Sequence, residues 1–439
     1  GTPTDADKYT FSFWCKRSKL GTQQSIFRST DDGTNDSHVT FQSDDTLRFE
    51  EYGGSASIGK LQTTQVFRDV SSWYHIVLVY DSGNGTAGNR MRMYVNGSEV
   101  TAFGTDNNPS QNADSFFNKD GEALHFGRTS YGGGANYFGG YVAEVVMCDG
   151  QAYAASDFGE FDEDSPTIWK PKDVSGLTFG NNGFYLDFED SSNLGNDANG
   201  GTDFSETNLA ATDQSTDTCT NNYSTLNPIF NNLANLTFSE GNLNVVAADA
   251  NYRSAISTIG VSKGKWYAEF KAVSGFNSTD KAVGIYRSDT IFVATTGLGN
   301  FTTGFTFSYG ATGNVRTNNG NNDTGEATFT DGDIIQVAMD LDNNKLYFGK
   351  NNTYINSGDP TTGSTGTGAY SITASTGEDF FFAVASISSG GAALWSCNFG
   401  SPSYANSSDA SDGNGYGAFE FAPPSGYYAL NSKNLAEYG

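Results

Sequence analysis

One short segment of this 439-residue chain concentrates oxygen atoms that could bind a metal ion: Asp31-Asp32-Gly33-Thr34-Asn35-Asp36. Calcium favours carboxylate and carbonyl oxygens supplied by flexible loops. Asp and Asn also favour solvated turns, and the chain is acidic throughout, with a formal net charge of −26. The sequence therefore favours an acidic turn, with a calcium site at Asp31, Asp32 and Asp36 as the alternative, and calcium is the only cofactor suggested.

A second segment, Tyr131-Gly132-Gly133-Gly134-Ala135-Asn136-Tyr137-Phe138, places aromatic rings on a glycine-rich loop. Sugars stack on exposed aromatic faces, and a neighbouring amide can hydrogen-bond their hydroxyl groups. Tyr131, Asn136 and Tyr137 are therefore candidate glycan-binding residues. An equally supported alternative is that one of these rings folds back into the core.

Glu160 and Asp162 begin a pattern of carboxylates used by glycosidases, in which two carboxylates project from one strand face. The third position of the pattern is Ser165 rather than an acid, and Pro166 follows directly. We therefore interpret this segment as a loop. No catalytic residue is predicted, and the chain is expected not to be an enzyme.

Two further patterns are interpreted as structural. Gly83–Gly88 matches the GxGxxG of dinucleotide sites, but the alternating residues Arg90–Val95 predict a strand where such a site needs a helix. The segment is therefore a predicted hairpin loop. His38, His75 and His125 fall in separate predicted strands, so a zinc site or a Ser–His pair has no support, and His75 is predicted to be a buried, hydrogen-bonded histidine.

Strands must position all of these residues. Tyr9–Arg17 alternates, with the aromatic side chains at odd positions on one face. Two hairpins, Trp73–Gly97 and Gly332–Asn351, each combine a long apolar strand ending in Asp, a turn on Asn or Gly, and a shorter return strand. With aromatic and β-branched runs separated by Gly, Asn and Asp, the sequence predicts an all-β chain of two antiparallel β-sandwich (jelly-roll) domains in tandem.

The predicted domains are a sandwich over residues 1–190, a polar linker over 191–222, a second sandwich over 223–418 and an extended, proline-containing segment over 419–439. The linker is predicted from its Ser, Asn, Gly, Asp and Thr content and its near lack of apolar residues. The chain does not begin with Met, so we expect it to be part of a longer or processed product.

Composition excludes several functions. The negative charge disfavours binding to nucleic acid or to an anionic membrane. No apolar run approaches the ~18 residues needed to span a bilayer. Cys15 and Cys148 fall in strands that could be neighbours, but buried thiols are favoured over a disulfide between them.

The predicted strands resemble known families. A laminin-G-like, concanavalin-type jelly roll is suggested by Tyr9–Arg17, Trp73–Asp81, Met91–Gly97 and Gly140–Asp149. Residues 223–400 resemble a SPRY domain, through Gly264–Glu269, Val283–Ile285, Gly332–Lys350 and Ser396–Gly400. The order of the two modules, with Asn181–Asn196 and Ala422–Leu435, is similar to tail-fibre or capsid-decoration proteins of marine bacteriophages.

The resemblance implies a non-catalytic protein of the virion surface, hence extracellular, that recognises host surface glycans or neighbouring virion proteins and forms a homo-oligomer. Laminin-G-like modules commonly bind glycans or proteins, some through calcium, and SPRY domains bind protein ligands with loops at one end of the sandwich. Two alternatives stay open. The chain could be a purely structural capsid or fibre component that does not bind the host, or an adhesin on a bacterial surface.

Overall fold

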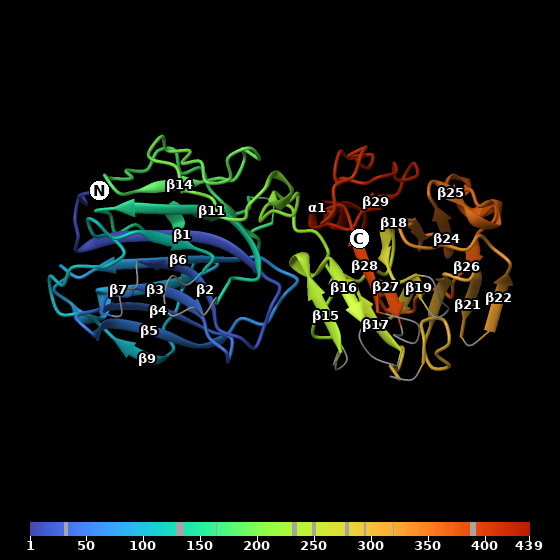
Figure 1. Cartoon of the computed structure of the whole chain (residues 1–439), viewed down its shortest axis with the longest axis horizontal. Helices are drawn as coiled ribbons and strands as arrows, with labels where there is room; N and C mark the ends of the chain where they lie inside the picture. The colour runs from blue at the N-terminus through green and yellow to red at the C-terminus, as the bar shows by residue number, and fades with distance from the viewer. Residues whose placement is uncertain are drawn as a thin grey trace. The chain divides into compact units, whose positions relative to one another are not determined.

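The computed structural model describes residues 1–29, 34–128, 136–163, 165–230, 235–247, 252–276, 281–293, 296–318, 320–386 and 392–439. The chain divides into two compact units, Gly1–Gln214 (unit 1) and Ser215–Gly439 (unit 2). Each is built from two mainly antiparallel sheets, as Figure 1 shows, so the predicted all-β sandwich class is confirmed. Within the described ranges, no helix has the length and apolar character that crossing a membrane would require.

Unit 1 contains two six-stranded sheets. The first has the order β14 (Phe184–Leu186), β11 (Gly140–Asp149), β1 (Lys8–Arg17), β6 (Tyr74–Asp81), β7 (Met91–Val95) and β8 (Ser98–Glu99). The second has the order β10 (Leu124–Phe126), β2 (Gln24–Ser29), β3 (His38–Phe41), β4 (Thr46–Gly53), β5 (Ala56–Val66) and β9 (Phe103–Asn107). A separate pair is formed by β12 (Gly159–Phe161) and β13 (Trp169–Pro171).

The core of unit 1 lies between its two sheets. The odd-numbered residues of β1 from Tyr9 to Cys15 face this core, as the alternation predicts. The opposite face of the same sheet carries a second buried cluster that includes Cys148, covered by Phe158 and Phe179 from the segment after β11. Cys15 and Cys148 therefore face opposite sides of one sheet, and no disulfide joins them.

Unit 2 has a larger sheet and a six-stranded sheet. The larger sheet has the order β15 (Leu236–Ser239), β16 (Asn244–Ala247), β28 (Ala393–Asn398), β18 (Lys265–Ser274), β23 (Ile334–Asp340), β24 (Lys345–Lys350) and β25 (Thr353–Tyr354), with β26 (Tyr370–Ser371) on β24 and β29 (Tyr428–Ala429) on β18. The second sheet has the order β17 (Arg253–Ile256), β27 (Phe380–Ser386), β19 (Ala282–Arg287), β20 (Thr306–Gly310), β21 (Asn314–Thr317) and β22 (Gly320–Thr324).

Both predicted hairpins are present. In unit 1, β6 pairs with β7 so that Ile76 lies opposite Val95. In unit 2, β23 pairs with β24 so that Ile335 lies opposite Lys350. Each hairpin thus joins a long buried strand to the shorter strand that returns beside it, at the centre of its sandwich.

The structure divides the chain at a different place from the sequence. Residues 191–214, predicted as a linker, are part of unit 1: Leu194 is buried, and the Asp197 carboxylate accepts hydrogen bonds from the backbone of Tyr185 and Asn199. Polar side chains that fold back onto the backbone therefore order this segment. Residues 419–439, predicted as extended, are part of unit 2 and end in helix α1 (Ser432–Tyr438).

Candidate functional site

The predicted glycan-binding loop is described from Asn136 onward, and Tyr131 lies outside the described residues. The backbone N–H of Ser25 on β2 donates to the Asn136 carbonyl oxygen over 2.8 Å, which ties the loop to the sheet. The Tyr137 side chain is 61% exposed. Phe138 packs instead on the core, with its ring 6.4 Å from that of Phe41. Of the two neighbouring rings, one is therefore a core residue and the other is available at the surface.

The predicted calcium loop is described in part. Asp31 and Asp32 lie outside the described residues. One Asp36 carboxylate oxygen forms an ion pair with Arg28, and the other lies 3.5 Å from the His38 ring. The described part of the chain contains no group of three or more His, Cys, Asp or Glu residues that could hold a metal ion.

Asp36 belongs to a charged network on the outer face of the second sheet of unit 1, which we call the charged face: Arg28, Asp36, His38, Arg48, Glu50 and Lys60. Alternation explains it, because Val39, Phe49 and Leu61 face the core and their neighbours face outward. Glu50 lies 3.4 Å from the His38 ring and 3.6 Å from the Lys60 ammonium. Burial raises the pKa of Glu50, but these cations dominate and lower it to about 2.

The carboxylates that resemble a glycosidase pattern do not form a catalytic pair. Gly159–Phe161 is the short strand β12 rather than the predicted loop, and it pairs with β13. The Lys170 ammonium on β13 lies 3.9 Å from Glu160 and 3.1 Å from Asp162, so it neutralises both at the surface. Both acids are therefore members of one surface ion-pair cluster.

His75 and the glycine-rich segment have the structural roles that were predicted. The His75 ring is fully buried, stacks on Trp14 and accepts a hydrogen bond from the Trp169 indole N–H over 2.9 Å. Burial lowers the pKa of His75 to about 3, so the ring is neutral. Residues 83–88 lie in the connection between β6 and β7, as predicted.

A larger candidate site, which sequence reasoning missed, lies on the outer face of the second sheet of unit 2. There a hollow of about 430 Å³ is lined by residues of the segment 291–303, by Tyr252 and by Arg316. A second hollow of about 240 Å³ shares Tyr252, Gly297, Asn300 and Arg316 with the first. We call the two together the unit 2 groove.

Strand alternation and two glycines build the groove. On β21, Val315 faces the core, so Arg316 faces outward. Gly299 has φ +84°, and a Cβ there would lie 2.3 Å from the Ser308 hydroxyl; a Cβ on Gly297 would lie 2.8 Å from the Tyr252 ring. The chain can therefore cross the sheet this closely only because both positions lack a side chain.

The segment beside the groove is held in place by buried side chains. Leu298 is buried with Tyr286 and Ala385 on the outer face of the sheet. The Leu298 carbonyl oxygen accepts a hydrogen bond from the Ser308 hydroxyl over 2.9 Å. Phe301 is 2% exposed, and its ring lies 6.2 Å from that of Tyr286. The groove wall is thus preformed rather than assembled by a ligand.

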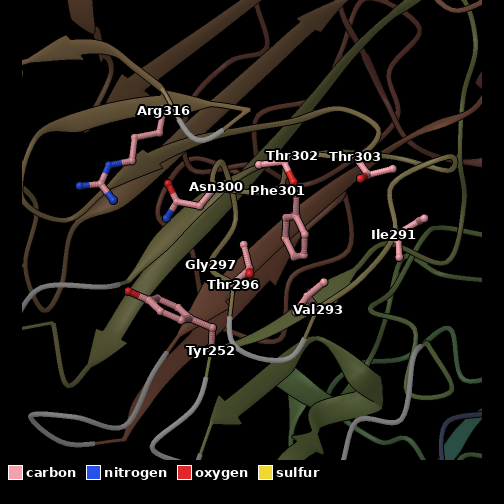
Figure 2. A pocket seen from close by; sticks show the side chains of 10 residues that line it. All are labelled: Tyr252, Ile291, Val293, Thr296, Gly297, Asn300, Phe301, Thr302, Thr303 and Arg316. Carbon is pink, nitrogen blue, oxygen red and sulfur yellow. The ribbon is translucent and has the colours of Figure 1, made fainter.

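The lining has two chemical sides. Figure 2 shows the polar ends of Arg316, Asn300 and Tyr252 on one side and Ile291 and Val293 on the other, with Phe301 between them. Ile291 is 63% exposed and Val293 46% exposed, so apolar surface is available at the rim. Three threonines, Thr296, Thr302 and Thr303, add hydroxyl groups. An amphiphilic ligand rich in hydroxyl groups matches such a lining.

Comparison with known proteins identifies the class of unit 1. Residues 2–154 match the family model of the Concanavalin A-like lectin/glucanases superfamily. This match agrees with the two-sheet jelly roll of unit 1, which is a lectin-like β-sandwich. No curated protein matches the chain. The SPRY assignment of residues 223–418 stays a prediction.

Three solved structures are similar to part of the chain, each with a low TM-score. The SPRY domain of human HERC1 is 17% identical, with 37% of this chain and 91% of that chain covered and a TM-score of 0.29. A heptameric SAP-like pentraxin from Limulus polyphemus is 19% identical, with 35% and 68% covered and a TM-score of 0.27. The Ruminococcus gnavus IT-sialidase CBM40, bound to α2,3-sialyllactose, is 15% identical, with 35% and 81% covered and a TM-score of 0.27.

Proposed function

We propose that this chain is a non-catalytic glycan-recognition protein that binds a host surface saccharide in the unit 2 groove. The observation that carries the proposal is the two-sided lining, in which Asn300 and three threonines offer hydrogen-bonding groups while the half-buried Tyr252 ring and the exposed Ile291 and Val293 offer apolar surface. The lectin-like fold of unit 1 supports the same class of function. Tyr137, exposed on unit 1, supplies a second, weaker point of contact.

Binding would be non-covalent. One face of a pyranose ring would lie against the aromatic and aliphatic side, and its hydroxyl groups would exchange hydrogen bonds with the Asn300 amide and the threonines. Because each such contact is weak, several copies of the chain on one particle would multiply the affinity. This is the advantage of the virion-surface, homo-oligomeric setting that the resemblance to phage proteins suggests.

The test is binding of the purified chain to a glycan array and to intact candidate host cells. Asn300→Ala and Tyr252→Ala should each weaken the affinity roughly five- to tenfold, since each removes one neutral hydrogen bond or one aromatic contact worth ~1 kcal/mol. Thr373→Ala, at an exposed position of unit 2 outside the groove lining, is the control and should bind normally.

Two outcomes would overturn the proposal: saturable glycan binding that both groove variants leave intact, or no binding to any glycan or cell. Tyr137→Ala measures the contribution of unit 1 separately. Calcium at Asp31, Asp32 and Asp36 stays a prediction, which the same array tests with and without chelator. Groove binding should not need calcium, because among the described residues no carboxylate lines the groove.

A further inference from the structure

We infer that the saccharide bound in the unit 2 groove carries an anionic group, a carboxylate or a sulfate, that pairs with Arg316. This inference rests on the proposed function and names the class of saccharide that the groove would select.

The first observation is the state of the Arg316 guanidinium. It has no hydrogen bond or ion pair within the described part of the chain, and its Nε is buried without an acceptor. The same sheet shows the alternative: the Arg287 guanidinium on β19 pairs with Asp289 through two contacts of 2.8 Å. A buried N–H without an acceptor is costly unless a ligand or water supplies one, and a planar guanidinium matches an oxyanion through parallel hydrogen bonds.

The second observation is the charge of the lining. The chain has 50 Asp and Glu residues against 24 Lys and Arg. Yet among the described residues that line the two hollows there is no Asp or Glu, while Arg316 places a guanidinium in both. The described lining thus presents a cation and no carboxylate on a strongly acidic protein, which suits an anionic ligand.

The third observation is where Arg316 lies. It lines both hollows, as do Asn300 and Tyr252, so a ligand that spans the groove passes the guanidinium whichever hollow its larger part occupies. In Figure 2 the guanidinium lies on the same side as the Asn300 amide and the Tyr252 hydroxyl, away from Ile291 and Val293. The sugar's anionic substituent would therefore lie on this polar side, with its apolar face turned to the aliphatic rim.

The experiment compares saccharides that differ only in charge. The probes are oligosaccharides ending in glucose, in glucuronic acid and in 6-sulfated glucose, measured by isothermal calorimetry with the full chain. We expect an anionic probe to bind at least tenfold more tightly than the glucose probe. Arg316→Gln should remove that preference while leaving the glucose probe within about twofold. Arg316→Lys, which keeps the charge but not the planar fork, should restore part of it.

The control is a lysine of unit 2 that lies outside the groove lining. Lys263→Gln removes the same charge from an exposed lysine of unit 2 outside the groove lining and should leave every probe unchanged. Equal binding of charged and neutral probes, unaffected by Arg316→Gln but weakened by Asn300→Ala, would overturn this inference and leave the proposed function standing. No binding of any probe, with no binding on the array, would overturn both. The carboxylate and sulfate arms decide which anion is preferred.

Discussion

The two units use the same hairpin and differ in what they place on the outer face of the second sheet. In unit 1, Asn96 follows β7 with φ +47°, and its amide oxygen accepts the backbone N–H of His75 over 2.8 Å. In unit 2, Asn351 follows β24 with φ +46° and accepts the backbone N–H of Ile334 over 2.9 Å. In both sandwiches, an asparagine at positive φ thus closes the hairpin by accepting a hydrogen bond from the first strand.

The outer faces of the second sheets of the two units differ in how their charged groups are paired. On the charged face of unit 1, Arg28, His38 and Lys60 are each paired with a carboxylate of the same face. On unit 2, the connection before β20 lies over the sheet and forms a wall of the groove. Arg316 in this groove pairs with no described residue. The sheet exposes an outer face in both units. Whether the charged groups on that face pair with one another or stay available to a ligand depends on the local numbers of cations and carboxylates.

The largest expected effect concerns a feature that the two units share. Glu269 is fully buried in unit 2 and accepts hydrogen bonds from the Tyr267 hydroxyl, the Asn398 amide and the backbone N–H groups of Glu420 and Phe421. Glu269→Ala would leave the backbone N–H groups of Glu420 and Phe421 without their acceptor, while the Asn398 amide and the Tyr267 hydroxyl would keep only the carbonyl oxygens of Ala418 and Phe421. We expect it to lower the free energy of unfolding of unit 2 by about 2–4 kcal/mol.

Unit 1 provides the parallel. The buried carboxylate of Glu51 accepts from the hydroxyls of Tyr9, Ser37 and Ser115 and from the backbone N–H of Phe116, so Glu51→Ala should cost a similar amount. Both are measured by denaturant unfolding at pH 5, below the value of about 7 to which burial raises the pKa of Glu269, because ionisation of a carboxyl group with a raised pKa destabilises the fold and would hide part of the cost. Glu437→Ala, on exposed α1, is the control. A cost below 1 kcal/mol in one unit only would show that the two supports are not equivalent.

The strands and hairpins of both sandwiches were predictable because short-range sequence patterns determine them. Strict alternation in Tyr9–Arg17 predicted the strand that the structure places at Lys8–Arg17. The groove was not predictable in this way. The connection before β20 shows no apolar periodicity. Its course depends on where Leu298 and Phe301 are buried against a sheet whose strands are distant in sequence. In sequence, Arg316 is one surface arginine of a four-residue strand.

Two other differences have local causes. The segment from Glu160 was interpreted as a loop because Ser165 and Pro166 interrupt the pattern, whereas Gly159–Phe161 forms the three-residue strand β12 by pairing with β13, which is too short to show alternation in sequence. Helix α1 escaped notice because it has seven residues, too few for a helical period to show. Its start did carry a signal: the Asn431 side chain accepts the backbone N–H of Asn434, which is the arrangement of an N-cap.

The next prediction tests whether the shared hairpin device contributes equally to both units. Asn96→Ala and Asn351→Ala should each lower the free energy of unfolding by about 1–2 kcal/mol, because alanine is disfavoured at positive φ and cannot accept the strand N–H. Replacement by Gly restores the backbone freedom but not the acceptor, so it should cost less than Ala at either position. Calorimetric unfolding of the four variants checks this. Gly variants that cost as much as Ala would show that the hydrogen bond accounts for the whole effect.

The smallest effect separates the two outer faces. The pKa of Glu50 is lowered to about 2 from 4.5, so its contribution to stability is present above pH 4.5 and is lost as the pH falls toward 2. Glu50→Gln should therefore cost about 1 kcal/mol at pH 6 and nothing near pH 2, less than the full pKa difference implies because solvent screens its partly exposed partners Arg48 and Lys60.

Arg316→Gln removes a charge that pairs with no described residue, so without ligand it should change the free energy of unfolding by less than about 0.5 kcal/mol at pH 6. Urea titrations of both variants at pH 6 and pH 3 measure the contrast. If Arg316→Gln destabilised unit 2 as much as Glu50→Gln destabilises unit 1, Arg316 would have a stabilising role in the unbound protein. The charged face of unit 1 and the groove face of unit 2 would then not differ in how their charged groups are paired.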